Sequence, residues 1–208
     1  MSIIDAELAR LRIDIPADQT SYIKRVIHTT ADFDYARNLR FTPGCLETVM
    51  PELVSGTLIV TDTNMARSGI SRAACDRLGI ETRCYMADED VARAASEAGT
   101  TRAVASMRKA SVHGHTIFAV GNAPTALLEL ARLMDEGYRP ALIIGVPVGF
   151  VNVVESKEAA WEACVRHGVP GIIAFGRKGG STVAAALCNA LVYDAARMED
   201  PSARGWQG

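Results

Sequence analysis

Short apolar runs bounded by turn residues recur along the chain and predict buried β-strands. The runs cover residues 57–62, 115–120, 141–146 and 171–175, and a weaker one covers 82–86. They are apolar on both faces, which fits the middle of a parallel sheet covered by helices better than a half-exposed antiparallel sheet. The pattern therefore predicts a mainly parallel sheet of five strands.

Segments of helical length separate these runs, so that strand and helix alternate. The predicted helices cover residues 64–78, 88–110, 123–136, 155–167 and about 180–196. This alternation is typical of the α/β class. Two more predicted helices, around 18–29 and 44–54, precede the first strand, so we expect the amino end to be an addition to the βα repeat.

The length and composition predict one domain. The chain has 208 residues, 49% of them hydrophobic, which suffices for one sizeable core. We place the domain at residues 1–196 because the remainder, 197–208, is polar and contains proline and glycine, and we expect it to be a disordered tail.

Charge and cysteine content narrow the possible partners and the compartment. The net charge of −2 gives no basic surface to neutralise nucleic-acid phosphates, so a nucleic-acid partner is disfavoured. The five cysteines are odd in number and never form CxxC, which indicates neither a disulfide framework nor a zinc ribbon. No stretch approaches the ~20 apolar residues of a membrane span, so we expect no membrane association and a cytoplasmic protein.

Four predicted strand-to-helix loops are unusual in composition. They read TDTNMARSG (61–69), GNAPTA (121–126), GVPVGFVNVVESK (145–157) and GRKGGST (176–182). Ligands of open α/β sheets bind at the carboxyl ends of the strands, where such loops lie. The last loop adds cations and glycine amides to a helix start, which suits an anion. Each loop alone could simply form a tight turn, but four together favour a shared pocket.

The helix before residue 30 carries a candidate proton donor. At 100° per residue its apolar positions form one stripe, whereas Arg25 and His28 lie together on the opposite face. These residues could form a solvated polar surface or the edge of a cleft, where the helix dipole would favour a protonated His28. His113 and His115 have no nearby ligand that would complete a metal site, so no metal is expected.

Five segments resemble the family of precorrin-8X and cobalt-precorrin-8 methylmutases. They read VIHTTADFDYA (26–36), TDTNMARSGI (61–70), GNAPTALLEL (121–130), PALIIGVPVGFVNVVESKEA (140–159) and GRKGGSTVAAALCNAL (176–191). The likeness extends from about residue 3 to 194. Where some members have a D-x-E-M pattern after the first strand, this chain has Asp62, Thr63, Asn64 and Met65.

The resemblance implies a three-layer α/β/α sandwich of the flavodoxin-like type, a homodimer and an isomerase without a cofactor. The implied reaction moves a methyl group from C11 to C12 by a 1,5-sigmatropic shift. It would convert precorrin-8X to hydrogenobyrinate, or the cobalt-containing substrate to cobyrinate, in cobalamin biosynthesis. The family's catalytic histidine corresponds to His28, and two arginines associated with the substrate correspond to Arg25 and Arg102.

The substrate would be a broad apolar ring edged with carboxylates, which needs an apolar floor and several anion sites. We therefore expect loop residues to join Arg25 and Arg102 in binding it. These residues are Thr61, Asp62, Asn64, Met65, Gly121, Asn122, Ala123, Gly145, Pro147, Val148, Gly149, Lys157, Arg177, Gly179, Gly180 and Ser181.

Two other functions compete with the isomerase. A non-catalytic tetrapyrrole carrier would use the same pocket, but would release its ligand unchanged. A phosphometabolite-binding α/β protein would rest on GRKGGST alone, and neither GxxxxGK[ST] nor GxGxxG occurs at the expected place.

Overall fold

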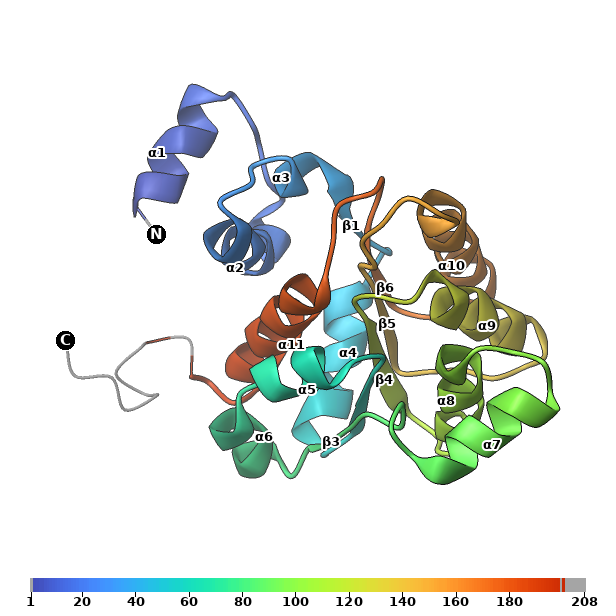
Figure 1. Ribbon diagram of the computed structural model, residues 1–208. Helices are drawn as coiled ribbons and strands as arrows, with labels where there is room; N and C mark the ends of the chain where they lie inside the picture. Colours follow the sequence, from blue (N-terminus) through green and yellow to red (C-terminus); the bar gives the residue numbers. More distant parts are fainter. Residues whose placement is uncertain (1, 199, 201–208) are drawn as a thin grey trace.

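A twisted sheet between two layers of helices forms the centre of the molecule (Figure 1). The computed structural model describes residues 2–198 and 200. The strands are β1 (Leu39–Phe41), β2 (Leu58–Thr61), β3 (Glu81–Arg83), β4 (Thr116–Val120), β5 (Leu142–Gly145) and β6 (Gly171–Ala174).

The order of the strands confirms the predicted α/β class. Along the sheet the order is β1-β6-β5-β4-β2-β3, and every pair except β1 with β6 is parallel. Without β1, the remaining five strands follow the order 2-1-3-4-5 that is typical of flavodoxin-like sheets. The chain order reverses direction between β2 and β4, and this switch point is the usual ligand position of such folds.

The sheet has six strands, whereas the sequence pattern predicted five. The strand that was missed, β1, pairs antiparallel with β6 at the edge of the sheet. It is three residues long, and its burial changes from buried Leu39 to exposed Arg40. Such a short, half-exposed edge strand lacks the continuous apolar run by which the central strands were found.

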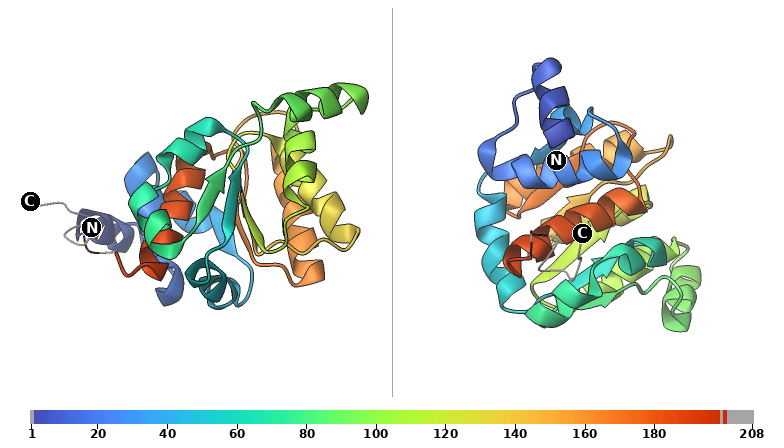
Figure 2. Two further views of the ribbon diagram at one scale, coloured as in Figure 1. Left: turned by 90° about the horizontal axis from the view of Figure 1, so that it is seen from below. Right: turned by 90° about the vertical axis from the view of Figure 1, so that its left-hand side faces the viewer.

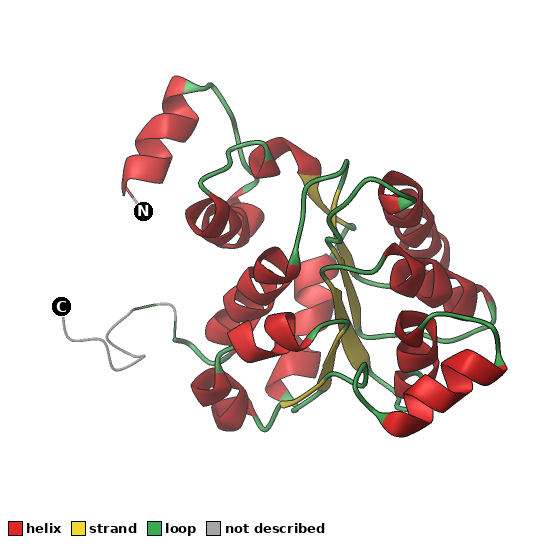
Figure 3. Ribbon diagram, in the orientation of Figure 1, coloured by secondary structure: helices red, strands yellow, loops and turns green. Residues whose placement is uncertain are grey.

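Helices cover both faces of the sheet, as Figure 2 and Figure 3 show. One face packs against α4 (Cys45–Val54), α5 (Asn64–Gly69), α6 (Arg72–Leu78) and α11 (Ser181–Ala195). The other face packs against α8 (Arg102–Ala110), α9 (Pro124–Asp135) and α10 (Val153–His167). Helix α7 (Glu89–Glu97) packs on α8 in a separate small cluster. Neighbouring strand residues point to opposite cores: Ile117 faces the first, whereas Phe118 faces the second.

Two of the predicted helices are each divided into two. The predicted helix 64–78 breaks after Gly69, and a new helix begins where the Ser71 hydroxyl accepts a hydrogen bond from the Ala74 amide. The predicted helix 88–110 breaks near Gly99, whose φ is +58°, and Thr101 caps the second half. Serine and threonine are favoured caps because their oxygens satisfy amides at a helix start.

The amino-terminal part forms an additional layer outside α11. It contains α1 (Ser2–Arg10), the 3-10 turn η1 (Ala17–Gln19), α2 (Thr20–Thr30) and α3 (Tyr35–Asn38). The helices predicted around 18–29 and 44–54 are confirmed as α2 and α4, whereas α1 was not predicted. The expected place of the second helix was wrong, because α4 follows β1 and packs against the sheet. Helix α2 packs on α11 through buried Tyr22, Ile23, Val26 and Ile27.

Most of the predicted tail lies outside the described residues. Residues 199 and 201–208 are not described, and Met198, near the start of that tail, is buried. The boundary between a domain at 1–196 and a tail therefore stays a prediction. Within the described residues, none of the helices has the length and apolar character needed to cross a membrane.

Candidate functional site

The four unusual loops meet at the carboxyl edge of the sheet. They follow β2, β4, β5 and β6, which are mutually parallel and therefore end on the same side. We call them together the loop edge: residues 62–63, 121–123, 146–152 and 175–180. The predicted grouping of these segments is confirmed by the strand order.

A buried carboxylate joins two of these loops at the switch point. Asp62 is 1% exposed, and its oxygens accept hydrogen bonds from the amides of Gly121, Asn122 and Ala123 at 2.8, 2.8 and 2.7 Å. Burial raises the pKa of Asp62, although the three amide donors act in the opposite direction. Asp62 thus caps α9 from a different strand, where the helix dipole favours a negative charge.

This bonding changes the role expected for the β4–α9 loop. Gly121, Asn122 and Ala123 were expected to contact the substrate, and free amides at this helix start would suit an anion. Three of those amides are already bonded to Asp62. A phosphate at the switch point would have to displace this carboxylate.

Close backbone contacts fix the remaining loops against one another. A Cβ at Gly179 would lie 2.1 Å from the carbonyl oxygen of Val146, so no side chain fits there. The amide of Gly180 donates to the same carbonyl at 2.8 Å. The hydroxyls of Thr63 and Ser181 are 2.8 Å apart, which links the loops that follow β2 and β6.

Lys157 supports the β6–α11 loop from α10. Its side chain is fully buried, and its Nζ donates to the carbonyl oxygens of Gly176 and Lys178, both at 2.8 Å. Burial lowers the pKa of Lys157 to about 8, because the charged form is poorly solvated there. The expected substrate contact of Lys157 stays a prediction, and its observed contacts are with the loop.

The two cations of the β6–α11 loop itself, Arg177 and Lys178, differ in their surroundings. The Nζ of Lys178 lies 2.6 Å from an oxygen of Asp32 and 2.6 Å from one of Asp34. Its charge is therefore used within the chain and is not free for a ligand. Arg177 is exposed, and its guanidinium lies 5.9 Å from the ring centre of Phe150.

Exposed apolar side chains accompany these charges on the loop edge. Phe150 is 85% exposed and Val151 76%, and both come from the β5–α10 loop. Met65, in α5, and Val148 are exposed as well. Met65 and Val148 were among the predicted site residues, whereas Phe150 and Val151 were missed. Their signal in the sequence is a pair of large apolar residues inside a loop, between Gly149 and Asn152.

Arg102 lies beside the loop edge, on the second face of the sheet. It begins α8, and the preceding Thr101 hydroxyl lies 3.1 Å from that of Thr125 in α9. The starts of α8 and α9 are therefore adjacent, which places exposed Arg102 near the β4–α9 loop. Asn64 is the exposed first residue of α5, directly after the β2 loop.

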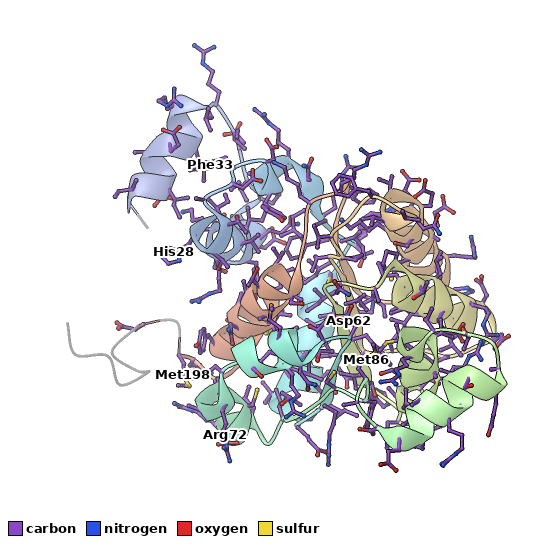
Figure 4. All side chains as sticks on the ribbon, in the orientation of Figure 1. His28, Phe33, Asp62, Arg72, Met86 and Met198 are labelled. Carbon is purple, nitrogen blue, oxygen red and sulfur yellow. The ribbon has the colours of Figure 1, made fainter. Side chains whose placement is uncertain are left out.

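Arg25 and His28 lie one turn apart on α2, half-buried and exposed respectively, and we call this surface the α2 face. His28 is exposed, and the guanidinium of Arg25 lies 4.9 Å from the ring centre of Tyr193 in α11. Figure 4 shows that the His28 side chain points outward and away from Asp62 at the loop edge. Within one chain, the fold brings the loop residues together but does not bring His28 among them.

The direction of α2 nevertheless brings its carboxyl end toward the loops. Tyr22, in its first turn, donates a hydrogen bond to Asp194 at the end of α11. Asp32, just beyond α2, pairs with Lys178, just before α11. The two helices are therefore antiparallel, and His28 lies in the half of α2 that is nearer to the loop edge.

The remaining histidines form no further site. His115 pairs with Glu52 at 3.3 Å beside a cavity of about 390 Å³ at the opposite, amino edge of the sheet. Among the described residues, no group of three or more His, Cys, Asp and Glu side chains could hold a metal ion. We assign no role to this cavity.

Comparison with known proteins decides the family. The family model described as Precorrin-8X methylmutase matches residues 1–194. The chain belongs to the precorrin-8X methylmutase family. This finding confirms the resemblance on which the expected fold, isomerase class and reaction were based.

Individual relatives agree with the family model. The cobalt-precorrin-8 methylmutase of Salmonella typhimurium is 46% identical over 82% of this chain and 79% of its own length. The precorrin-8X methylmutase of Pseudomonas aeruginosa is 40% identical over 86% of both chains. A crystal structure of the precorrin-8x methyl mutase from Thermus thermophilus superposes with a TM-score of 0.80 at 34% identity, covering 95% of this chain and 98% of that one.

Proposed function

We propose that this methylmutase family member moves the C11 methyl group of precorrin-8X, or of cobalt-precorrin-8, to C12. Membership of the family carries the proposal, because the match includes all four loops and α2. The chemistry of the loop edge supports it. Exposed Phe150 lies near Arg177, and its neighbour Val151 is exposed as well. This combination suits an apolar ring with carboxylates at its rim.

In this proposal the chain supplies binding groups and one proton donor. Arg25, Arg102 and Arg177 would bind peripheral carboxylates, and the apolar loop side chains would contact the ring. His28 would protonate a ring position, so that the changed conjugation drives the methyl migration. Because the reaction is an isomerisation, a proton must also leave the ring, and His28 must recover its own before the next turnover.

We further propose that the active form is a homodimer. In one chain His28 faces away from the loop edge, so the two sets of groups do not enclose a common space. A second copy whose loop edge approaches the α2 face would bring them together and would also cover the apolar side chains. Such exposed apolar residues are typical of binding surfaces when they cluster.

The test is to incubate the purified chain with precorrin-8X and with cobalt-precorrin-8 in parallel. The bound pigment is then released by denaturation and identified by absorbance and NMR. An isomerised product from either substrate supports the enzyme, and the better substrate identifies the metal state of the ring. Tight binding with unchanged pigment would instead indicate the tetrapyrrole carrier, whereas absence of binding would contradict both functions.

The dimer is tested separately, by sedimentation velocity with and without the pigment. A purely monomeric protein that still isomerises precorrin-8X would contradict the shared site.

A further inference from the structure

Lys178 lies where the loop edge meets the segment that follows α2. Its Nζ contacts both Asp32 and Asp34 at 2.6 Å, across more than 140 residues of sequence. These two hydrogen bonds raise the pKa of Lys178 above its ordinary value. The pairing joins the loop that carries Arg177 to the end of the helix that carries His28.

The segment after α2 is folded so that both carboxylates face the lysine. Ala31 ends the helix in the left-handed region, with φ +55°, and its amide donates to the carbonyl oxygen of Ile27. The amide of Asp34 then donates to a carboxylate oxygen of Asp32 at 3.0 Å. This turn holds the two aspartates on the same side, two residues apart.

The main chain of Lys178 is also fixed, by a lysine of α10. Its carbonyl oxygen accepts a hydrogen bond from the buried ammonium of Lys157 in α10. The same ammonium binds the carbonyl of Gly176, so residues on both sides of Arg177 are fixed. One residue thus connects α10, the β6–α11 loop and the end of α2.

We propose that Lys178 is a positioning residue, which holds the β6–α11 loop and the His28 end of α2 in their working arrangement through Asp32 and Asp34. This inference rests on the proposed function for its effect on turnover. Lys178 does not need to touch the substrate. It fixes how the loop edge and the α2 face of one chain lie relative to each other, and in the proposed dimer both surfaces must fit the partner at the same time.

The chain contains a matched control for this arrangement. Lys109, in α8, bridges Asp88 and Asp90 at 2.7 and 2.8 Å, so it also binds two aspartates two residues apart. It joins α8 to the start of α7, and its Nζ also lies 5.0 Å from the ring centre of Tyr85. Lys109→Met therefore removes an equivalent pair of surface contacts without touching the loop edge or α2.

The experiment compares Lys178→Met, Lys178→Arg, Lys109→Met and the double variant Asp32→Asn/Asp34→Asn. Turnover of precorrin-8 is measured together with the hydrogen exchange of a peptide covering residues 28–38. We expect Lys178→Met to lower kcat by about tenfold, less than the ~10²-fold that a 1 Å displacement can cost, because α2 keeps its packing on α11. KM should change by less than about threefold, since Lys157 still binds the carbonyls on both sides of Arg177 and the arginines are retained.

Four results together support the proposal. The peptide 28–38 exchanges faster in Lys178→Met, the double aspartate variant shows the same loss of kcat, Lys178→Arg restores most of it, and Lys109→Met behaves as the wild type. A wild-type kcat in Lys178→Met, or an equal loss in Lys109→Met, overturns it. If the wild type itself does not isomerise precorrin-8, the proposed function is wrong, and unchanged exchange of peptide 28–38 then overturns the positioning role independently.

Discussion

The loop edge and the α2 face differ in how their residues are held. At the loop edge, Asp62 binds three amides, Gly179 admits no Cβ and Lys157 binds two carbonyls. On the α2 face, His28 is exposed and Arg25 stacks on one ring. Contacts within a single chain are enough to fix the loop edge. The α2 face acquires a defined environment only when a ligand or a second copy covers it. The proposed chemistry therefore places the proton donor on the less enclosed of the two regions.

The largest expected effect tests the α2 face. His28→Ala should lower the turnover of precorrin-8 by about 10²- to 10⁴-fold, the usual contribution of a general acid. Binding of the macrocycle should remain, because the carboxylate-binding arginines are unchanged. Single-turnover absorbance and a binding titration measure the two quantities, with His113→Asn at the opposite edge as the control. Wild-type turnover in His28→Ala would remove the imidazole from the mechanism.

The next effect tests the rigidity of the loop edge. In the wild type, the two Asp62 oxygens accept from three backbone N–H groups. Asp62→Asn replaces one of these oxygens by an amide nitrogen, so at least one N–H group loses its acceptor. We expect the free energy of unfolding in urea to fall by about 3 kcal/mol, as for a buried hydrogen-bond network that loses a charged member. Asp76→Asn, at an exposed site in α6, is the matched control. A loss no greater than that of the control would mean that Asp62 does not organise these loops.

A pH titration tests Lys157 in the same region. The folded pKa of Lys157 is about 8, below the ordinary lysine value of 10.5. Between these values the unfolded chain binds more protons at this residue, so its contribution to stability rises with pH. The buried cysteines act oppositely, since burial raises the pKa of Cys45 to about 12. The comparison must therefore be with Lys157→Met, which keeps the cysteines. From pH 8 to 9.5 the wild type should gain about 2 kcal/mol relative to that variant, at ~1.4 kcal/mol per unit. A constant difference would show that Lys157 is not desolvated.

The smallest effect concerns the exposed part of the loop edge. Phe150→Ala should weaken macrocycle binding about tenfold, since one aromatic side chain buried on binding contributes roughly 1.5 kcal/mol. Stability should stay within ~0.5 kcal/mol, because the side chain is 85% exposed. Val112→Ala, exposed at the other edge, should change neither quantity. Equal affinity for wild type and Phe150→Ala would exclude this side chain from the ring surface.

Much of the fold could be predicted because the central strands are apolar on both faces. The runs that became β2, β4, β5 and β6 were found in this way, and their carboxyl ends located the loop edge. Strand β1 was missed because three residues at an edge carry too little periodicity. Gly69 and Gly99 interrupt apolar patterns that otherwise continue, so the helix breaks at those positions were missed as well.

The candidate site was harder to predict because its contacts are long-range. Asp62 at a strand end has the sequence signal of a ligand-binding residue, and only the fold shows that its oxygens bind amides about 60 positions later. Lys178 similarly has the signal of an anion-binding residue until Asp32 and Asp34 are brought beside it. Side-chain partners across such distances are decided by packing and leave no local pattern.

The carboxylate at the switch point has a consequence for the shape of any ligand. Open α/β sheets ordinarily bind their ligands in the crevice outside the strand ends where the chain order reverses. In this chain the buried carboxylate of Asp62 occupies the helix start at that point. A ligand must therefore bind over the loops and not at the helix start. This favours a wide, flat molecule bound around its edge over a narrow one bound at one end.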